Sequence, residues 1–261
     1  MSGVLIEDRG AVRILTIDRA EVHNAIDATI AWQLGDAMAA ASDDDAVRVV
    51  VLTGAGTRAF CAGGDLKAIA RGETYLHPTH PEWRFAGFVA HRIAKPVIAA
   101  VNGVAIGGGA ELALACDIVL ASDGASFAFP EVTHGAVAAA GGGFRLPRTV
   151  PRLIATELML TGDRIDARRA LDIHLVNRIF DAEHLVDESV AMGQRIARSA
   201  PLAVQAHLRL ARGETIDGGR PLEQDGWQRL DAEWQALRGT DDAREGPRAF
   251  AEKRRPVWQG R

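Results

Sequence analysis

The sequence predicts an α/β fold followed by a helical region, and two observations carry that prediction. In the first half, apolar runs rich in β-branched residues alternate with segments of helical periodicity. From about residue 183 onward only helical patterns remain. At 261 residues, with 48% hydrophobic and 25% charged residues, the chain has the composition of an ordinary globular protein. We therefore expect an α/β core over residues 1–200 and a helical region over residues 201–261.

The first half contains four segments that predict strands. VRILTID, at residues 12–18, has β-branched character, and three later segments are nearly continuous apolar runs, as is typical of strands covered on both faces. These three are VRVVVLTG at 47–54, KPVIAAVNG at 95–103 and CDIVLAS at 116–122. Helical periodicity is found at residues 24–42, with Asp27 as the cap, at 65–72 and at 81–94.

The second half predicts amphipathic helices at residues 183–200, 201–213, 221–239 and 241–258. Pro201 and the stretch from Gly213 to Pro221 separate the first three. No period of 20–50 residues is visible, so a solenoid is not indicated.

Charge and cysteine content exclude several function classes. The net charge of −4 gives no reason to expect a nucleic-acid partner. Cys61 and Cys116 lack metal-ligand spacing, which favours a reducing compartment, and the HPTH stretch at 77–80 has no acidic or third histidine partner nearby. We expect no metal site. The first residues lack the pattern of a secretory signal, and no apolar run is long enough to span a membrane, so the sequence predicts a cytoplasmic protein without a membrane partner.

Two glycine clusters point to chemistry. The P-loop pattern, the G-x-G-x-x-G fingerprint and the G-x-S-x-G elbow are all absent, which argues against a nicotinamide dehydrogenase and a serine hydrolase. The remaining interpretation is that bare backbone N–H groups approach a ligand oxygen. FCAGGDL at 60–66 and GGGAEL at 107–112 both lead into helices, where free N–H groups lie at the positive end of the helix dipole. If the two ends face each other, they form an oxyanion hole.

These motifs, with KPVIAAVNGVAIGGGAELALACDIVLAS and FAFPE, resemble the crotonase superfamily of enoyl-CoA hydratases and isomerases. The similarity runs from RAEVHNAID near residue 19 to EGPRAFAEKRRPVW near the C-terminus. The closing segment, with NAID and GGFRLP, is most similar to the carnitinyl-CoA dehydratase branch. The resemblance implies a spiral of ββα units, a C-terminal helical region that mediates trimerisation, and a homotrimer or dimer of trimers.

The resemblance also implies an activity and the residues that perform it. The chain would be a hydro-lyase that adds water reversibly to a 2-enoyl-CoA, with no cofactor, since coenzyme A is part of the substrate. The N–H groups of Gly64 and Gly108 would hold the thioester oxygen. Glu111 would assist the attack of water on the β-carbon, and Glu131 would protonate the α-carbon. The residues that would bind the substrate are Ala25, Ala62, Asp65, Leu66, Lys67, Phe250 and Lys253, the last two reaching the CoA of a neighbouring subunit.

Several alternatives stay open at this point. A Δ3,Δ2-enoyl-CoA isomerase would need only one carboxylate, and an acyl-CoA-binding protein without turnover would need neither. Glu111 could lie on a helix surface, although its neighbours are almost wholly apolar. Ala138 and Ala139 depart from the family pattern, which means either extra room beside the reacting carbons or a lost family contact. This departure makes a carnitinyl group doubtful as the acyl group of the substrate.

Other residues also keep two interpretations. His134 is more typical of a tolerated loop histidine than of a substrate contact, and Cys61 of a small buried thiol. Tyr75, Trp83 and Phe85, in the variable loop 72–88, either line the acyl pocket or serve ordinary packing.

Overall fold

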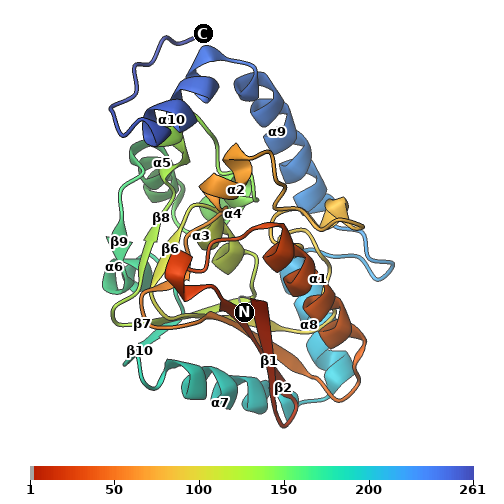
Figure 1. Cartoon of the computed structure of the whole chain (residues 1–261). Helices are drawn as coiled ribbons and strands as arrows, with labels where there is room; N and C mark the ends of the chain where they lie inside the picture. The colour runs from red at the N-terminus through yellow and green to blue at the C-terminus, as the bar shows by residue number, and fades with distance from the viewer. Residues whose placement is uncertain (1–2) are drawn as a thin grey trace.

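The computed structural model describes residues 3–261, in which two β-sheets are surrounded by helices (Figure 1). The larger sheet has the order β1-β2-β3-β5-β7-β10, parallel except for the β1–β2 hairpin. Its strands are β1 Gly3–Arg9, β2 Val12–Asp18, β3 Val49–Gly54, β5 Val97–Val101, β7 Ile118–Ser122 and β10 Arg178–Phe180. The smaller sheet contains β4 Ala59–Cys61, β6 Val104–Ile106, β8 Ser126–Ala128 and β9 Ile165–Asp166.

The chain passes three times from the larger sheet to the smaller one and then into a helix. The three passages are β3–β4–α2, β5–β6–α3 and β7–β8–η3, with α2 at Leu66–Ala70, α3 at Gly108–Leu114 and the 3-10 helix η3 at Pro130–His134. This repetition is the predicted spiral of ββα units. Because β4, β6 and β8 are parallel neighbours, the segments that follow them leave from one edge of the small sheet. Both glycine clusters and Glu131 are thereby brought to the same place.

The predicted strands and the first helix are confirmed. Helix α1, Ala28–Asp43, begins where Asp27 accepts a hydrogen bond from the N–H of Ile30. Every residue of β3 is buried, as its apolar run predicts for a strand covered on both faces. Strand β1 is absent from the sequence prediction. Most of its side chains are exposed, so it has no buried face of the kind that marks the other strands.

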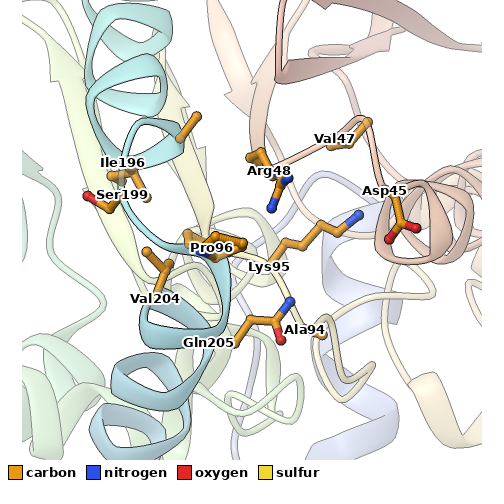
Figure 2. Close-up of a pocket in the computed structure, with 12 residues that line it drawn as sticks. Asp45, Val47, Arg48, Ala94, Lys95, Pro96, Ile196, Ser199, Val204 and Gln205 are labelled. Atoms are coloured by element: carbon orange, nitrogen blue, oxygen red, sulfur yellow. The ribbon is translucent and has the colours of Figure 1, made fainter.

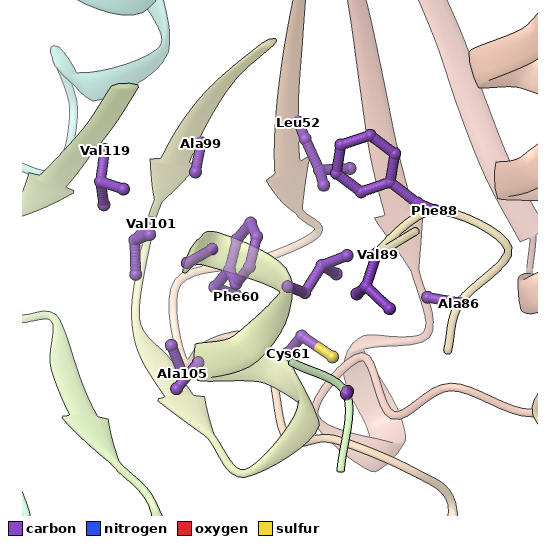
Figure 3. Close-up of a cluster of buried hydrophobic side chains, with 14 of the residues drawn as sticks. Leu52, Phe60, Cys61, Ala86, Phe88, Val89, Ala99, Val101, Ala105 and Val119 are labelled. Carbon is purple, nitrogen blue, oxygen red and sulfur yellow. The ribbon is translucent and has the colours of Figure 1, made fainter. Parts of the chain in front are cut away.

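The helix predicted at 81–94 is wrong. Only the 3-10 turn η2, Pro81–Trp83, forms there, and Arg84, Ala86 and Gly87 take left-handed backbone angles that end any helix. The segment still buries its apolar side chains: Figure 3 shows Phe88 and Val89 beside Leu52 of β3. The periodicity therefore reported burial of a loop and not helical hydrogen bonding.

The helical second half is confirmed, with α7 at Leu185–Ala197, α8 at Pro201–Arg212, α9 at Pro221–Arg238 and α10 at Asp241–Ala251. Three further helices, which the sequence prediction lacks, precede it: α4 Gly142–Thr149, α5 Arg152–Thr161 and α6 Ala167–Asp172. Helix α7 covers the larger sheet, where an added Cβ at Gly193 would lie 2.9 Å from Val12. Within residues 3–261, no helix combines the length and apolar character needed to cross a bilayer.

A small hollow of about 50 Å³ lies where the α7–α8 junction meets the loop before β5 (Figure 2). Lys95 extends along it and donates hydrogen bonds to the carbonyl oxygens of Ala41 and Asp44 near the end of α1. Burial lowers the pKa of the Lys95 amine. Through these hydrogen bonds, Lys95 connects the loop before β5 to the end of α1, so we assign it a structural role.

Candidate active site

The two glycine clusters meet at the edge of the small sheet. An added Cβ at Gly63 would lie 3.2 Å from the backbone nitrogen of Gly108, so the two segments are in direct contact. Over residues 3–261, the N–H groups of Gly64 and Gly108 donate no hydrogen bond to another protein atom. Two free backbone donors therefore lie next to each other, one of them at the first residue of α3.

Glycine is required at two positions of the second cluster. Gly107 takes a left-handed φ of 55° with ψ −127°, which L side chains rarely adopt. An added Cβ at Gly109 would lie 1.9 Å from the carbonyl oxygen of Cys61, so α3 packs directly on the backbone of β4. Cys61 itself is a buried thiol whose pKa burial raises to about 12, as expected for a packing residue.

Glu111 is buried on α3, with only 3% of its surface exposed. Its Oε1 accepts a hydrogen bond of 2.8 Å from the N–H of Gly142, at the start of α4. Burial, and after it the charge of Glu131, raises the pKa of the Glu111 carboxyl. A surface role for Glu111 is thus excluded.

Glu131 has different surroundings, in the 3-10 helix η3. Both of its carboxylate oxygens are buried, and neither has a hydrogen-bond partner among the described residues. Burial raises the pKa of this carboxyl. Its Oε1 lies 3.4 Å from the position that a Cβ on Gly107 would take, which places it beside the second glycine cluster. A buried polar group without a partner is rare and favours a functional role.

Two aromatic residues of the loop 72–88 cover the glycines. The Phe85 ring lies 2.7 Å from the Cβ position of Gly108 and 3.9 Å from that of Gly64. Tyr75 packs on Phe85 with ring centroids 5.5 Å apart and lies 3.8 Å from the Cβ position of Gly64. Burial and the charge of Glu111 raise the pKa of the Tyr75 hydroxyl. For these two residues, the structure favours lining of the site.

Trp83 and the nearby histidines serve packing instead. Trp83 stacks on His80 at 4.0 Å and on His91 at 3.8 Å, between ring centroids. His77 is buried and its Nε2 lies 3.0 Å from a carboxylate oxygen of Asp36. Over residues 3–261, no three His, Cys, Asp or Glu side chains are arranged to hold a metal ion.

Five of the predicted substrate-binding residues surround Gly64. Asp65 caps α2 by accepting the N–H groups of Lys67 at 3.0 Å and Ala68 at 3.2 Å. Arg19 lies 3.1 Å from Asp65 and donates to the carbonyl oxygen of Ala25 at 2.7 Å. The others are Ala62, which donates to the carbonyl oxygen of His23, and the exposed residues Leu66 and Lys67.

Phe250 and Lys253 lie elsewhere, at and just beyond the end of α10. The exposed Phe250 ring lies 5.9 Å from that of His134, on the same 3-10 helix as Glu131. His134 itself is the last residue of η3, and its Nδ1 lies 2.9 Å from the hydroxyl oxygen of Thr133.

A cavity of about 580 Å³ opens beside Glu131. Its walls come from η3, α4, α5 and α9 and are mainly apolar, including Phe129, Val137, Phe144 and Leu230. Of the two alanines that depart from the family pattern, Ala138 lines this cavity and Ala139 does not, which favours extra room at position 138 alone. The sequence analysis missed the residues of α4, α5 and α9 in this wall. The apolar positions of α9 were the available signal, but a single sequence does not show which face they cover.

Comparison with known proteins identifies the family. A model of the enoyl-CoA hydratase/isomerase family matches residues 7–261. The chain belongs to the enoyl-CoA hydratase/isomerase family. Among its relatives, a carnitinyl-CoA dehydratase of Proteus mirabilis is 43% identical over 257 residues, which are 97% of each chain.

Solved structures of the family agree with the fold. That of a carnitinyl-CoA dehydratase from Mycobacterium avium is 50% identical, with all of both chains covered and a TM-score of 0.95. An enoyl-CoA hydratase from Mycobacterium tuberculosis is 41% identical over 99% of each chain, with a TM-score of 0.76. These likenesses confirm the predicted family and its α/β spiral fold, and the relatives' names agree with the predicted hydro-lyase class.

Proposed function

We propose that this protein is a hydro-lyase that adds water reversibly across the double bond of a 2-enoyl-CoA thioester. The observation that carries the proposal is a pair of buried carboxyl groups with raised pKa values, Glu111 and Glu131, beside two free backbone N–H groups. Hydration needs this combination, because one group must take a proton from water and another must give one to carbon.

The thioester oxygen would accept hydrogen bonds from the N–H groups of Gly64 and Gly108. As water attacks the β-carbon, negative charge moves onto this oxygen and forms an enolate. The two donors are fixed before the reaction, and removing one donor of this kind typically costs about 100- to 1,000-fold in rate. Phe85, packed over both glycines, would keep solvent water away from these donors.

The two carboxyl groups would divide the proton transfers. Glu111 accepts the N–H of Gly142, a bond that orients its carboxyl and partly opposes the rise in pKa caused by burial and by Glu131; we assign to it the proton taken from water. Glu131 lacks any such donor among the described residues, which favours its protonated form. The water oxygen would bond to the β-carbon as its proton passes to Glu111, and Glu131 would deliver its proton to the α-carbon; transfer of a proton from Glu111 back to Glu131 would restore the starting state. The two groups titrate as an interacting pair, since each charge opposes the other.

The rest of the CoA would extend from Gly64 along residues 22–26 and the start of α2. Ala25, Ala62, Asp65, Leu66 and Lys67 surround that path. We also propose a homotrimer, or a dimer of trimers, in which Phe250 and Lys253 reach the CoA bound by a neighbouring subunit. Light scattering tests the assembly, and a clean monomer would contradict it.

Turnover of crotonyl-CoA tests the activity. The enoyl-thioester absorbance should fall when purified protein is added. A Δ3,Δ2-isomerase would instead interconvert 3-enoyl- and 2-enoyl-CoA without forming a 3-hydroxyacyl-CoA. Binding of acyl-CoA with no loss of absorbance, by a correctly folded protein, would indicate a binding protein and overturn the proposal.

A further inference from the structure

The cavity beside Glu131 carries information about the acyl group. If the thioester oxygen lies at Gly64 and Gly108, the acyl chain would extend toward Glu131, which also lines this cavity. A crotonyl group ends one carbon beyond the double bond and would cover only a small part of this 580 Å³ cavity, which is partly open to solvent. Apolar wall left in contact with water gains nothing from binding, so the cavity fits a larger acyl group.

The shape of the wall favours bulk close to the reacting carbons. Four small residues, drawn from η3's following loop, α4 and α9, line the cavity: Ala136, Ala138, Gly143 and Gly226. At Gly143 and Gly226 the space beside the backbone is already filled by Leu230 and Phe144, so the added width lies at Ala136 and Ala138. The remaining wall is largely aliphatic or aromatic, so the group that fills this width must be apolar.

The charges around the cavity disfavour a cationic acyl group. A quaternary ammonium is usually held by several aromatic faces or by a buried carboxylate. Here Phe144, one of two aromatic residues in the wall, already has the guanidinium carbons of Arg145 and Arg148 at 5.2 and 5.3 Å from its ring centroid. Arg148 also lines the cavity and pairs with no carboxylate of residues 3–261.

The remaining charges do not reverse this preference. Glu131 is the buried carboxylate in the wall and is occupied by the reaction. Glu233 is exposed to solvent on α9, and the nearby Arg229 pairs with Asp225. Solvent screens its attraction for a cation inside the cavity.

We propose that the substrate of this protein is a 2-enoyl-CoA whose acyl group ends in an uncharged, bulky apolar unit, branched or cyclic. This inference rests on the proposed function and names its substrate class. The relatives named carnitinyl-CoA dehydratase take, by that name, an acyl group with a quaternary ammonium at this end. The substrate proposed for this chain differs from theirs in that respect.

Three substrates test the inference: crotonyl-CoA, crotonobetainyl-CoA, and a 2-enoyl-CoA with a cyclohexyl group beyond the double bond. We expect kcat/KM for the cyclohexyl substrate to exceed the other two by about tenfold or more, because two additional buried methylene groups already contribute that factor. A preference for crotonobetainyl-CoA, or no gain over crotonyl-CoA, would overturn the inference.

A pair of variants on α5 makes the test independent of total activity. Leu153 and Leu160 are 72% and 69% exposed, and only Leu160 of the two lines the cavity. Leu160→Trp should lower the cyclohexyl-to-crotonyl ratio of kcat/KM by about threefold or more, because the added ring occupies the cavity. Leu153→Trp should leave that ratio unchanged. Equal ratios in the two variants would place the acyl group elsewhere.

Binding measurements keep this inference distinct from the proposed function. The saturated analogues of the same three thioesters can be titrated calorimetrically against wild-type protein, whether or not it turns over. The cyclohexyl analogue should bind about tenfold more tightly than butyryl-CoA and than the trimethylammonium analogue. If the protein does not turn over any substrate but binds the analogues in this order, only the hydro-lyase activity would be refuted. The opposite order would refute the substrate class.

Discussion

The two sides of the candidate site are built in opposite ways. On the side of Glu111, α3 packs on the backbone of β4, and the carboxylate is held by a hydrogen bond of 2.8 Å from Gly142. On the side of Glu131, the carboxyl has no partner among the described residues, and the residue lines a cavity of about 580 Å³. In the proposed mechanism, the glycine side would fix the reaction geometry, and the cavity side would select the acyl group and deliver the proton.

The largest effect should come from neutralising either carboxyl group. Glu111→Gln and Glu131→Gln keep nearly the same volume but remove proton transfer, so each should lower hydration of crotonyl-CoA by about 100- to 10,000-fold. The double variant should be barely worse than the poorer single one, because groups acting as a unit are not additive. Exposed Glu157 on α5 supplies the control, and Glu157→Gln should keep normal activity. Near-normal hydration by Glu131→Gln would show that Glu131 does not deliver the proton.

The rigidity of the glycine side is tested by Gly109→Ala. The added Cβ would lie 1.9 Å from a backbone oxygen, so α3 and β4 must separate. We expect the free energy of unfolding to fall by about 2–3 kcal/mol in urea titrations. At Gly124 an added Cβ meets no atom within 4 Å, and Gly124→Ala should be nearly neutral. Equal stability of both variants would show that the close approach is not needed.

The absence of a partner for Glu131 predicts a dependence of stability on pH. Because its pKa is raised above the usual value of 4.5, the folded state binds more protons than the unfolded state above that pH. The free energy of unfolding should therefore fall as pH rises through this window. Glu131→Gln removes this loss, so its melting temperature should exceed that of the wild type at pH 8 by about 2–4 °C, or about 1 kcal/mol. The gap should shrink at pH 4. A wild type that is more stable than Glu131→Gln at pH 8 would contradict an unpartnered buried carboxyl.

The smallest effect is expected for the hydroxyl of Tyr75. Tyr75→Phe keeps the ring that packs on Phe85 over the glycines, and should lower kcat/KM less than about fivefold. Tyr75→Ala removes the ring and should cost more. A large loss from Tyr75→Phe alone would give the hydroxyl a role in the reaction and sharpen the account of this side.

Local signals in the sequence account for much of this architecture. The apolar runs of β3, β5 and β7 identify buried strands, and Asp27 marks the start of α1. The glycine clusters, read with the family resemblance, lead to Glu111. The turn at Arg84 to Gly87 could not be predicted, because a loop that buries apolar residues has the same periodicity as a helix.

The cavity is equally hidden in the sequence. Its wall joins η3, α4, α5 and α9, elements far apart in the chain, and only the tertiary packing brings Ala138 beside Leu230. The absence of a partner for Glu131 is likewise a property of packing, since a sequence lists the carboxyl but not the donors that fail to reach it.

A crystal structure of the protein with an unreactive saturated acyl-CoA tests the central claim most directly. The quantity to measure is the distance from the thioester oxygen to the backbone nitrogens of Gly64 and Gly108. We predict both distances between about 2.7 and 3.1 Å, the range of an effective oxyanion hole. The carboxyl groups of Glu111 and Glu131 should then lie beside the two carbons that follow the thioester. A thioester oxygen bound away from these two amides would contradict the account.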